Sequence, residues 1–463
     1  MAVEIERKFL LAPVNIESLL KRESLEFKKI LIEQFYIKAS KDDTRRYRRV
    51  ENKFIYTQKS GFGLIREEFE KEVSKDEYLK AKESFKDKII SKFRYFVKLD
   101  GVTLEIDEFM GPLSGLTILE VEFRTKASSD EFTFPEIFKP YLITEVTADI
   151  KFTNGYLSKT LKVPTIEYDL KRAFGAIKEA NHQKASINIK IPPYQSISDS
   201  IRLIVYALAL SIETNQEAIL EKNYDRERLH QFRVANRKLK TLLKIFGSYF
   251  KKRWLKKRLK FISKNISKTN QNRDLDIYLE SLHSFDNLID DKELSCLKNH
   301  LQLLQSKANK NILKLLNSKK FQKELQKLKN LKGLKSNLDA PTILVVENIL
   351  RDKYSKVLQT ISKLNKNSSN KEFHKLRIEL KEFRYLIEFF SNAIRSFDTK
   401  EVLRDLKKMQ DIFGEFQDLN TQIEYLKSLQ SECEVDTMLN RLTHLRANQK
   451  EKILKELESF KLF

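Results

Sequence analysis

Acidic and basic residues alternate near the start of the chain, in the run Glu4, Ile5, Glu6, Arg7, Lys8. Successive side chains of a β-strand point to opposite faces, so Glu4, Glu6 and Lys8 would share one face. Carboxylates bind hard cations such as Mg²⁺, and an ammonium group binds phosphate oxygens. The run is therefore either a strand face exposed to water or part of a site for a metal ion and a phosphate group.

The same alternation recurs in five further segments, each with charges on one face and mostly apolar residues on the other. One such strand is most simply a solvent-exposed face. Six strands with charges of both signs instead favour a barrel with a polar interior and an apolar outer surface covered by helices. The five segments carry Arg46 and Arg48; Arg66, Glu68 and Glu70; Lys92 and Arg94; Glu105 and Asp107; and Glu120 and Glu122.

Short strands separated by turns are expected up to about residue 160, which predicts an α+β domain with a closed antiparallel β-barrel. A helix is expected over 75–88, with Ser74 as its cap. The expected strands are 3–11, 28–38, 44–50, 53–60, 64–73, 90–98, 102–109 and 116–124.

Charge is distributed unevenly along the chain. Residues 1–160 contain 29 Lys and Arg against 28 Asp and Glu, and the remaining residues contain 59 against 37. The second part therefore holds nearly all of the net charge of +23, and its positive field attracts polyanions. No apolar run is long enough to span a bilayer, so a cytoplasmic protein without a membrane partner is expected. Cys296 and Cys433 have no CxxC partner and are expected to be buried thiols.

The chain is expected to be all-helical from about residue 196, after a proline-containing linker over 161–195. A repeat lies within it, because HQFRVANRKLK at 230–240 returns 144 residues later as HKLRIELKEFR at 374–384. Two units, about 196–340 and 341–463, predict two helical bundles related by a pseudo-twofold axis.

Each copy of the repeat places four residues within an arc of roughly 80° on one helix face. A single stripe of this kind is more often an ordinary exposed face, and no i+4 ligand supports metal binding by the histidines. Its repetition favours a surface that binds a polyanion. The first basic stripe is His230, Arg233, Arg237 and Lys240, and the second is His374, Arg377, Lys381 and Arg384.

The N-terminal part resembles the CYTH superfamily, the triphosphate tunnel metalloenzymes. EIERK matches the ExExK signature, and the segments EQFYI, RYRR, YTQKS, IREEFEKEV, KFRYFV, LEIDEF, LEVEF and EVTADIKFTN follow in a similar order over nearly all of 1–160. The resemblance implies a closed barrel whose tunnel binds triphosphate together with Mg²⁺ or Mn²⁺. The stretch ADIKFTN departs from the family pattern at Ala148, Ile150 and Phe152.

The resemblance also implies roles for individual residues. Glu4, Glu6 and Lys8 would form the catalytic set, and the metal ligands would be Glu4, Glu6, Glu120, Glu122 and Asp107. The residues that would bind triphosphate are Lys8, Arg46, Arg48, Lys59, Arg66, Lys92, Arg94 and Lys151. Glu68, Glu70 and Glu105 would complete the interior.

Residues 196–463 resemble the CHAD domain, a histidine-containing helical domain that often follows a CYTH domain. The resemblance implies a basic central surface, formed by the two basic stripes, that binds inorganic polyphosphate. The segment GEFQD at 414–418 departs from the GEHND-like stretch of many members.

The sequence thus predicts metal-dependent hydrolysis of inorganic triphosphate, with a second domain that binds long-chain polyphosphate in the cytoplasm or at polyphosphate granules. Two alternatives are a non-catalytic polyphosphate-binding scaffold and an enzyme acting on an organic triphosphate such as thiamine triphosphate, a nucleoside triphosphate or ATP in a cyclisation. Nucleic-acid binding is disfavoured because no reading motif is present. The oligomeric state cannot be predicted from the sequence.

Overall fold

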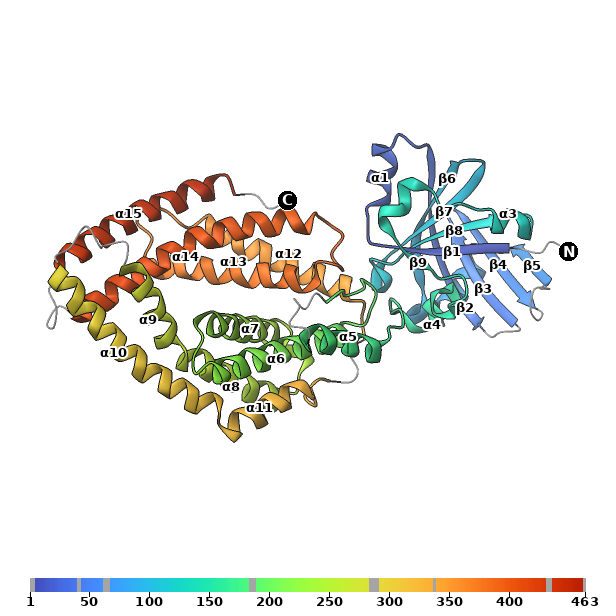
Figure 1. Ribbon diagram of the computed structural model, residues 1–463. Helices are drawn as coiled ribbons and strands as arrows, with labels where there is room; N and C mark the ends of the chain where they lie inside the picture. The colour runs from blue at the N-terminus through green and yellow to red at the C-terminus, as the bar shows by residue number, and fades with distance from the viewer. Residues whose placement is uncertain are drawn as a thin grey trace. The chain divides into compact units, whose positions relative to one another are not determined.

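The computed structural model describes residues 5–39, 43–60, 67–182, 189–282, 291–335, 339–429 and 435–460. The chain divides into two compact units, each described by itself below (Figure 1). The N-terminal unit comprises Met1–Ile166 and Ala340–Leu344, and the helical unit comprises Glu167–Asp339 and Val345–Phe463.

A nine-stranded antiparallel sheet, in the order β5-β4-β3-β2-β6-β7-β8-β1-β9, forms most of the N-terminal unit. The antiparallel sheet forms as expected, although among the described residues the two outer strands, β5 and β9, are not hydrogen-bonded to each other and so do not close it by hydrogen bonds. β9 has four residues and, among the described strands, pairs with β1 alone. The strands are β1 (Ile5–Leu11), β2 (Phe27–Ala39), β3 (Asp43–Val50), β4 (Lys53–Ser60), β5 (Glu67–Glu72), β6 (Ile90–Leu99), β7 (Val102–Phe109), β8 (Thr117–Phe123) and β9 (Leu142–Glu145).

One face of this sheet is apolar and covered by helices, as the alternation predicts. Leu19 and Leu20 of α1 (Ile16–Arg22) pack into a core with apolar residues of β1, β6, β7 and β8. The helix expected at 75 forms as α2 (Lys75–Glu83), whose Tyr78 ring lies 5.5 Å from that of Phe35 on β2. The sequence did not predict β9, α1, α3 (Lys126–Asp130) or α4 (Asn154–Thr160).

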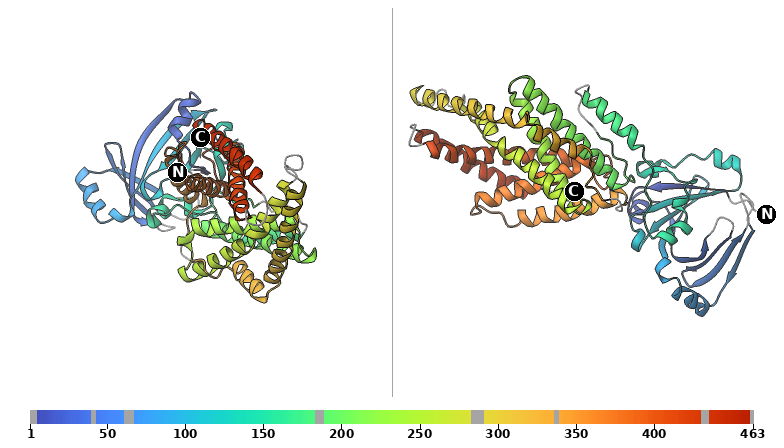
Figure 2. Two further views of the ribbon diagram at one scale, coloured as in Figure 1. Left: turned by 90° about the vertical axis from the view of Figure 1, so that its left-hand side faces the viewer. Right: turned by 90° about the horizontal axis from the view of Figure 1, so that it is seen from below.

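The helical unit contains eleven helices among its described residues, and none of them is long and apolar enough to cross a membrane. Two sets of helices, α6 to α11 and α12 to α15, correspond to the two copies of the repeat and form neighbouring layers (Figure 2). The helices are α5 (Leu170–His182), α6 (Ile197–Glu221), α7 (Arg226–Ile245), α8 (Lys252–Lys268), α9 (Asn270–Ser281), α10 (Asp291–Leu316), α11 (Lys319–Lys329), α12 (Thr342–Ile361), α13 (Asn370–Phe390), α14 (Thr399–Leu429) and α15 (Asp436–Glu458).

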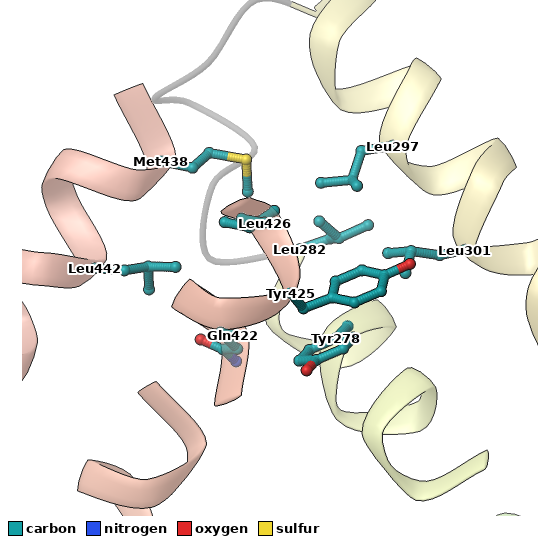
Figure 3. A pocket seen from close by; sticks show the side chains of 9 residues that line it. All are labelled: Tyr278, Leu282, Leu297, Leu301, Gln422, Tyr425, Leu426, Met438 and Leu442. Atoms are coloured by element: carbon teal, nitrogen blue, oxygen red, sulfur yellow. The ribbon is translucent and has the colours of Figure 1, made fainter. Parts of the chain in front are cut away.

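The two sets are joined by an apolar core between α9, α10, α14 and α15 (Figure 3). Tyr278 of α9 stacks on Tyr425 of α14 with ring centroids 4.6 Å apart, and its hydroxyl donates to the Thr421 carbonyl at 3.0 Å. The cavity there has a volume of only about 20 Å³, room for little more than one water molecule. It is therefore a packing feature and not a ligand site.

One cysteine differs from expectation. Cys296 is exposed on α10, because the helix turns the next residue, Leu297, into the core between the two sets. Cys433 lies outside the described residues.

Candidate active site and polyanion surface

The face of the N-terminal sheet opposite the apolar core carries the charges, and we call it the charged face. The strand order brings residues far apart in sequence into register, with Arg94 opposite Asp107, Glu105 opposite Glu120, and Lys8 opposite Glu120. The charged face consists of Glu6, Lys8, Arg46, Arg48, Glu70, Lys92, Arg94, Glu105, Asp107, Glu120 and Glu122.

Arg94 of β6 connects three carboxylates on this face. Its guanidinium donates to both oxygens of Asp107 at 2.6 Å, to Glu120 Oε2 at 2.8 Å, and to Glu105. Charge-assisted bonds of this kind fix a planar guanidinium in one orientation. Although burial opposes it, Asp107, Glu120 and Glu105 raise the pKa of Arg94, so this cation stays charged at any physiological pH.

Glu120 lies between Arg94 and Lys8. The Lys8 ammonium donates to Glu120 Oε1 at 2.8 Å and lies 3.0 Å from a Glu6 oxygen. Burial would raise the pKa of Glu120, but Lys8, Lys92 and Arg94 outweigh it and lower that pKa to about 2. Glu120 is therefore a permanent anion held between two cations.

Lys92 is fully buried beneath this cluster. Its ammonium pairs with Asp107 and lies 3.3 Å from Asn154 Oδ1 of α4. Burial lowers the pKa of Lys92 to about 8, although Asp107 opposes that shift. The ion pair with Lys92 therefore helps to fix the position of the Asp107 carboxylate.

Arg46 and Arg48 of β3 differ from the other cations of the charged face, because they have no acidic partner among the described residues. The Nε atoms of both are buried without a hydrogen-bond partner. Burial, with repulsion from Arg46 and Arg94, lowers the pKa of Arg48 to about 10. Two adjacent guanidinium groups that form no ion pair with the described residues make a site that attracts an anion, and their forked donors match phosphate oxygens.

The acidic residues fit a divalent cation in their chemistry. Glu6 and Glu122 lie directly opposite each other on β1 and β8, and Glu120 is the next inward residue on β8. Burial raises the pKa of Glu105, and repulsion from Glu122 adds to the shift. These donors are all carboxylate oxygens, which suit Mg²⁺ or Mn²⁺. In the described part of the chain no group of three or more such ligands is arranged to hold a metal ion, and Glu120 is paired with Lys8 and Arg94.

The remaining predicted residues take no part in the contacts described above or fall outside the residues that the structure describes. Glu4 and Arg66 fall outside the described residues, while Lys59 and Glu68 are opposite each other in the backbone register of β4 and β5. Glu70 accepts a hydrogen bond from Thr57 at 2.9 Å. Lys151 lies in a turn beyond β9, where its ammonium donates to the Thr165 carbonyl at 3.0 Å.

The charged face also contains neutral polar residues that the sequence analysis did not predict. Gln34 and Tyr36 of β2 are opposite Arg48 and Arg46, and Thr57 of β4 is also opposite Arg46. Asn154 approaches Lys92 from α4. The alternation within EQFYI gave a signal for the first two, whereas Asn154 is brought near only by the fold.

The two basic stripes meet in the helical unit. Arg237 of the first stripe, on α7, is close enough to repel both Arg377 and Lys381 of the second, on α13. Burial, with repulsion from Arg377 and Arg237, lowers the pKa of Lys381 to about 7. Arg273 of α9, which the sequence prediction missed, adds a further positive charge beside His230 and Arg233.

Equivalent arginines of the two stripes have different surroundings. Arg233 is buried and donates to Thr269 Oγ1 at 2.5 Å, the Ile266 carbonyl at 3.0 Å and Asn270 Oδ1 at 2.9 Å. The repeat spacing of 144 places Phe413 and Gly414 where Thr269 and Asn270 stand, so Arg377 lacks those acceptors. Its Nε is buried without a hydrogen-bond partner. Arg377 is therefore available to bind an anion, whereas Arg233 connects helices.

The remaining stripe residues are partly engaged. The His374 ring shares a 2.7 Å hydrogen bond with Gln417 of α14, the residue that follows Phe416 in GEFQD. Arg384 donates to Glu388 at 2.7 Å and to Gln410 at 2.8 Å. Lys240 is half-buried next to Lys244, and burial lowers its pKa.

Comparison with known proteins gives matches for both units. The family described as the CHAD domain matches residues 206–427. An inorganic triphosphatase of Acetivibrio thermocellus is 33% identical over 161 residues, which cover 34% of this chain and 95% of that protein. An inorganic triphosphatase of Nitrosomonas europaea is 31% identical over 160 residues, covering 34% of this chain and 98% of that protein. A crystal structure of the CHAD domain from the plant Ricinus communis matches with a TM-score of 0.50 at 20% identity, over 60% of this chain and 96% of that one.

Proposed function

Because the chain belongs to the CYTH family of inorganic triphosphatases through its N-terminal third and continues into a CHAD domain, we propose that it hydrolyses inorganic triphosphate with a divalent metal and binds inorganic polyphosphate through its helical unit. The observation that carries the first part is the charged face, where Arg46 and Arg48, which form no ion pair with the described residues, lie beside an acid cluster. An anion site adjoining hard oxygen donors suits a metal–polyphosphate substrate.

The basic residues bind and orient the substrate. Arg46 and Arg48 hold phosphate oxygens without first having to release an acid. Lys8 and Arg94 already pair with Glu120, so they are fixed in place and can share their remaining donors with a phosphate. Lys92 contributes indirectly, by holding Asp107 beneath the cluster.

Glu6, Glu120 and Glu122 are the residues that would hold the divalent cation. When bound, such a cation neutralises phosphate charge and lowers the pKa of a water ligand. Glu105, whose pKa burial raises, and Asp107 border this position and add to the negative potential that favours a cation there.

The helical unit would hold long polyphosphate chains at Arg237, Arg377 and Lys381. Burial lowers the pKa values of the last two, Asp418 only partly offsets this, and none of the three has an acidic hydrogen-bond partner among the described residues. Tethering raises the local concentration of chain ends at the catalytic unit and keeps the protein at polyphosphate deposits in the cytoplasm.

Phosphate release from a substrate panel tests the catalytic proposal. Triphosphate should be hydrolysed in the presence of Mg²⁺ or Mn²⁺, and chelation by EDTA should abolish turnover. ATP and thiamine triphosphate should react more slowly. Preference for an organic triphosphate would change the substrate assignment, and the absence of turnover with every substrate and metal would favour a polyphosphate-binding scaffold.

A further inference from the structure

The helix α8 carries an unusual concentration of positive charge. From Arg228 to Arg273 the chain has 46 residues with 16 Lys and Arg and no Asp or Glu. The basic stripe of α7 accounts for only part of this excess. The largest group of the remaining charges lies on α8, which the proposed polyphosphate site does not use.

The charges of α8 form one continuous face. At 100° per residue they lie within an arc of roughly 120°, and at 1.5 Å per residue they extend over roughly 22 Å. All are exposed to solvent. The α8 basic face consists of Arg253, Lys256, Lys257, Lys260, Lys264 and Lys268.

The opposite side of α8 packs against the rest of the helical unit through Arg258, Ile262 and Asn265, so the α8 basic face is directed away from the core. Asn265 donates to Asn236 of α7 at 3.2 Å, and Ile262 is buried. The buried Arg258 pairs with Glu324 of α11 and donates to its carbonyl at 3.0 Å. Arg258 thus has an acid of its own, whereas within the described part of the chain no ion pair reaches the α8 basic face.

Among the residues that the structure describes, no acidic side chain offsets the repulsion within the α8 basic face. The six cations occur at i,i+3 and i,i+4 spacings, where like charges destabilise a helix. The first turn also contains Lys252 and Arg253, which oppose the helix dipole, and neither an acidic residue nor a side-chain cap offsets them. A bound polyanion would remove both unfavourable effects.

We propose that the α8 basic face is a second docking surface for long-chain inorganic polyphosphate, separate from the two basic stripes. This inference rests on the proposed function of the helical unit. Lysines provide compact point charges that suit a phosphate chain without bases, and the exposed face has no aromatic residue on which a nucleobase could stack. A chain long enough to reach both surfaces gains affinity through bivalency, whereas a short one cannot.

The test compares two triple variants of the full chain. One replaces Lys256, Lys260 and Lys264 by Ala, and the matched control replaces the exposed Lys298, Lys307 and Lys310 of α10, which removes the same charge. Affinity is measured for polyphosphate of about one hundred phosphates and of about ten phosphates, across a salt series. Ala retains high helix propensity, and circular dichroism checks that both variants fold.

The α8 variant should bind the long chain about tenfold more weakly, with a salt slope shallower by two to three, and the short chain within about twofold of wild type. The control should match wild type with both probes. Equal effects of the two variants would overturn the proposal. A DNA duplex serves as a further probe, and an α8 variant that loses DNA binding but keeps its polyphosphate affinity would also overturn it. Wild type that binds neither probe would instead refute the proposed function of the helical unit.

Discussion

Polyphosphate binding by the helical unit should weaken as pH rises, because Lys381 has a pKa of about 7 in the free protein. The charged groups around it are Arg377 and Arg384 on its own helix α13, Arg237 on α7 and Asp418 on α14. Burial and the three arginines disfavour the ammonium, and Asp418 only partly offsets them. A bound phosphate chain reverses this balance, so binding draws a proton onto Lys381.

The magnitude follows from that pKa. If the bound chain returns Lys381 toward its ordinary pKa, the apparent Kd scales with 1 + 10^(pH−7), about 4 at pH 7.5 and about 33 at pH 8.5. Affinity should therefore fall about 8-fold over this unit of pH, or about 1.2 kcal/mol. His230 contributes little, because burial lowers its pKa and its imidazole is already neutral at both pH values.

Binding of long-chain polyphosphate, measured by calorimetry at constant ionic strength, tests this expectation. Wild type should show the 8-fold change, and Lys381→Ala should show less than about twofold, with weaker binding at pH 7.5. Lys240→Ala, on the other stripe, should retain the full dependence. An unchanged slope in the Lys381 variant, or a flat wild-type profile, would refute the reasoning.

Three further predictions concern single residues. Glu120→Gln should lower triphosphate turnover by about 100-fold or more in a phosphate-release assay, because Lys8 and Arg94 lose the anion that both contact. Glu108→Gln is the control, because Glu108 lies on the other face of the same sheet, and its turnover should stay near that of wild type. Arg233→Ala should reduce the free energy of unfolding in urea by about 2 kcal/mol, because three hydrogen-bond acceptors lose their donor. Arg377→Ala should not reduce it, and equal losses in the two variants would show that the two arginines have the same structural role. Phe232→Ala should cost about 3–5 kcal/mol in the same urea titration, because Phe232 is fully buried, and a loss below about 1 kcal/mol would contradict the packing described.

Strand alternation was sufficient to predict the charged face. The period of two assigned Glu6 and Lys8 to one face and Phe9 to the other, and the same argument placed Arg94 with Asp107. Which charges meet depends on strand order, which joins β6, β7, β8 and β1 across long stretches of sequence. The pairing of Glu120 with both Lys8 and Arg94 therefore could not be read from the motifs, and neither could the lack of hydrogen bonds between the described residues of β5 and β9.

The repeat in the helical half shows a second limit. Its spacing predicted that two basic stripes exist, and the structure places Arg237 near Arg377 and Lys381. The two motifs match in sequence, but their arginines differ in hydrogen bonding. Arg233 donates to acceptors at the end of α8 and on α9, whereas the buried Nε of Arg377 has no hydrogen-bond partner. That difference arises outside the motif, at Thr269 and Asn270, and becomes visible only once the helices are packed.

The central claim is that the charged face binds and hydrolyses triphosphate, and β3 offers an internal comparison for it. Arg46 and Arg48 point to the charged face, whereas Arg45 pairs with Asp43 and Arg49 donates to the Glu51 carbonyl at 3.0 Å. Each lost charge-assisted bond to phosphate costs about 1.5–3 kcal/mol, so the double variant at Arg46 and Arg48 should lose at least about 100-fold in kcat/KM.

The most direct measurement is therefore phosphate release from triphosphate by two double variants of the same strand. Arg46→Ala with Arg48→Ala should nearly abolish turnover, and Arg45→Ala with Arg49→Ala should leave it within about threefold of wild type. Equal losses in the two variants, or full activity in the first, would contradict the assignment of the active site to the charged face.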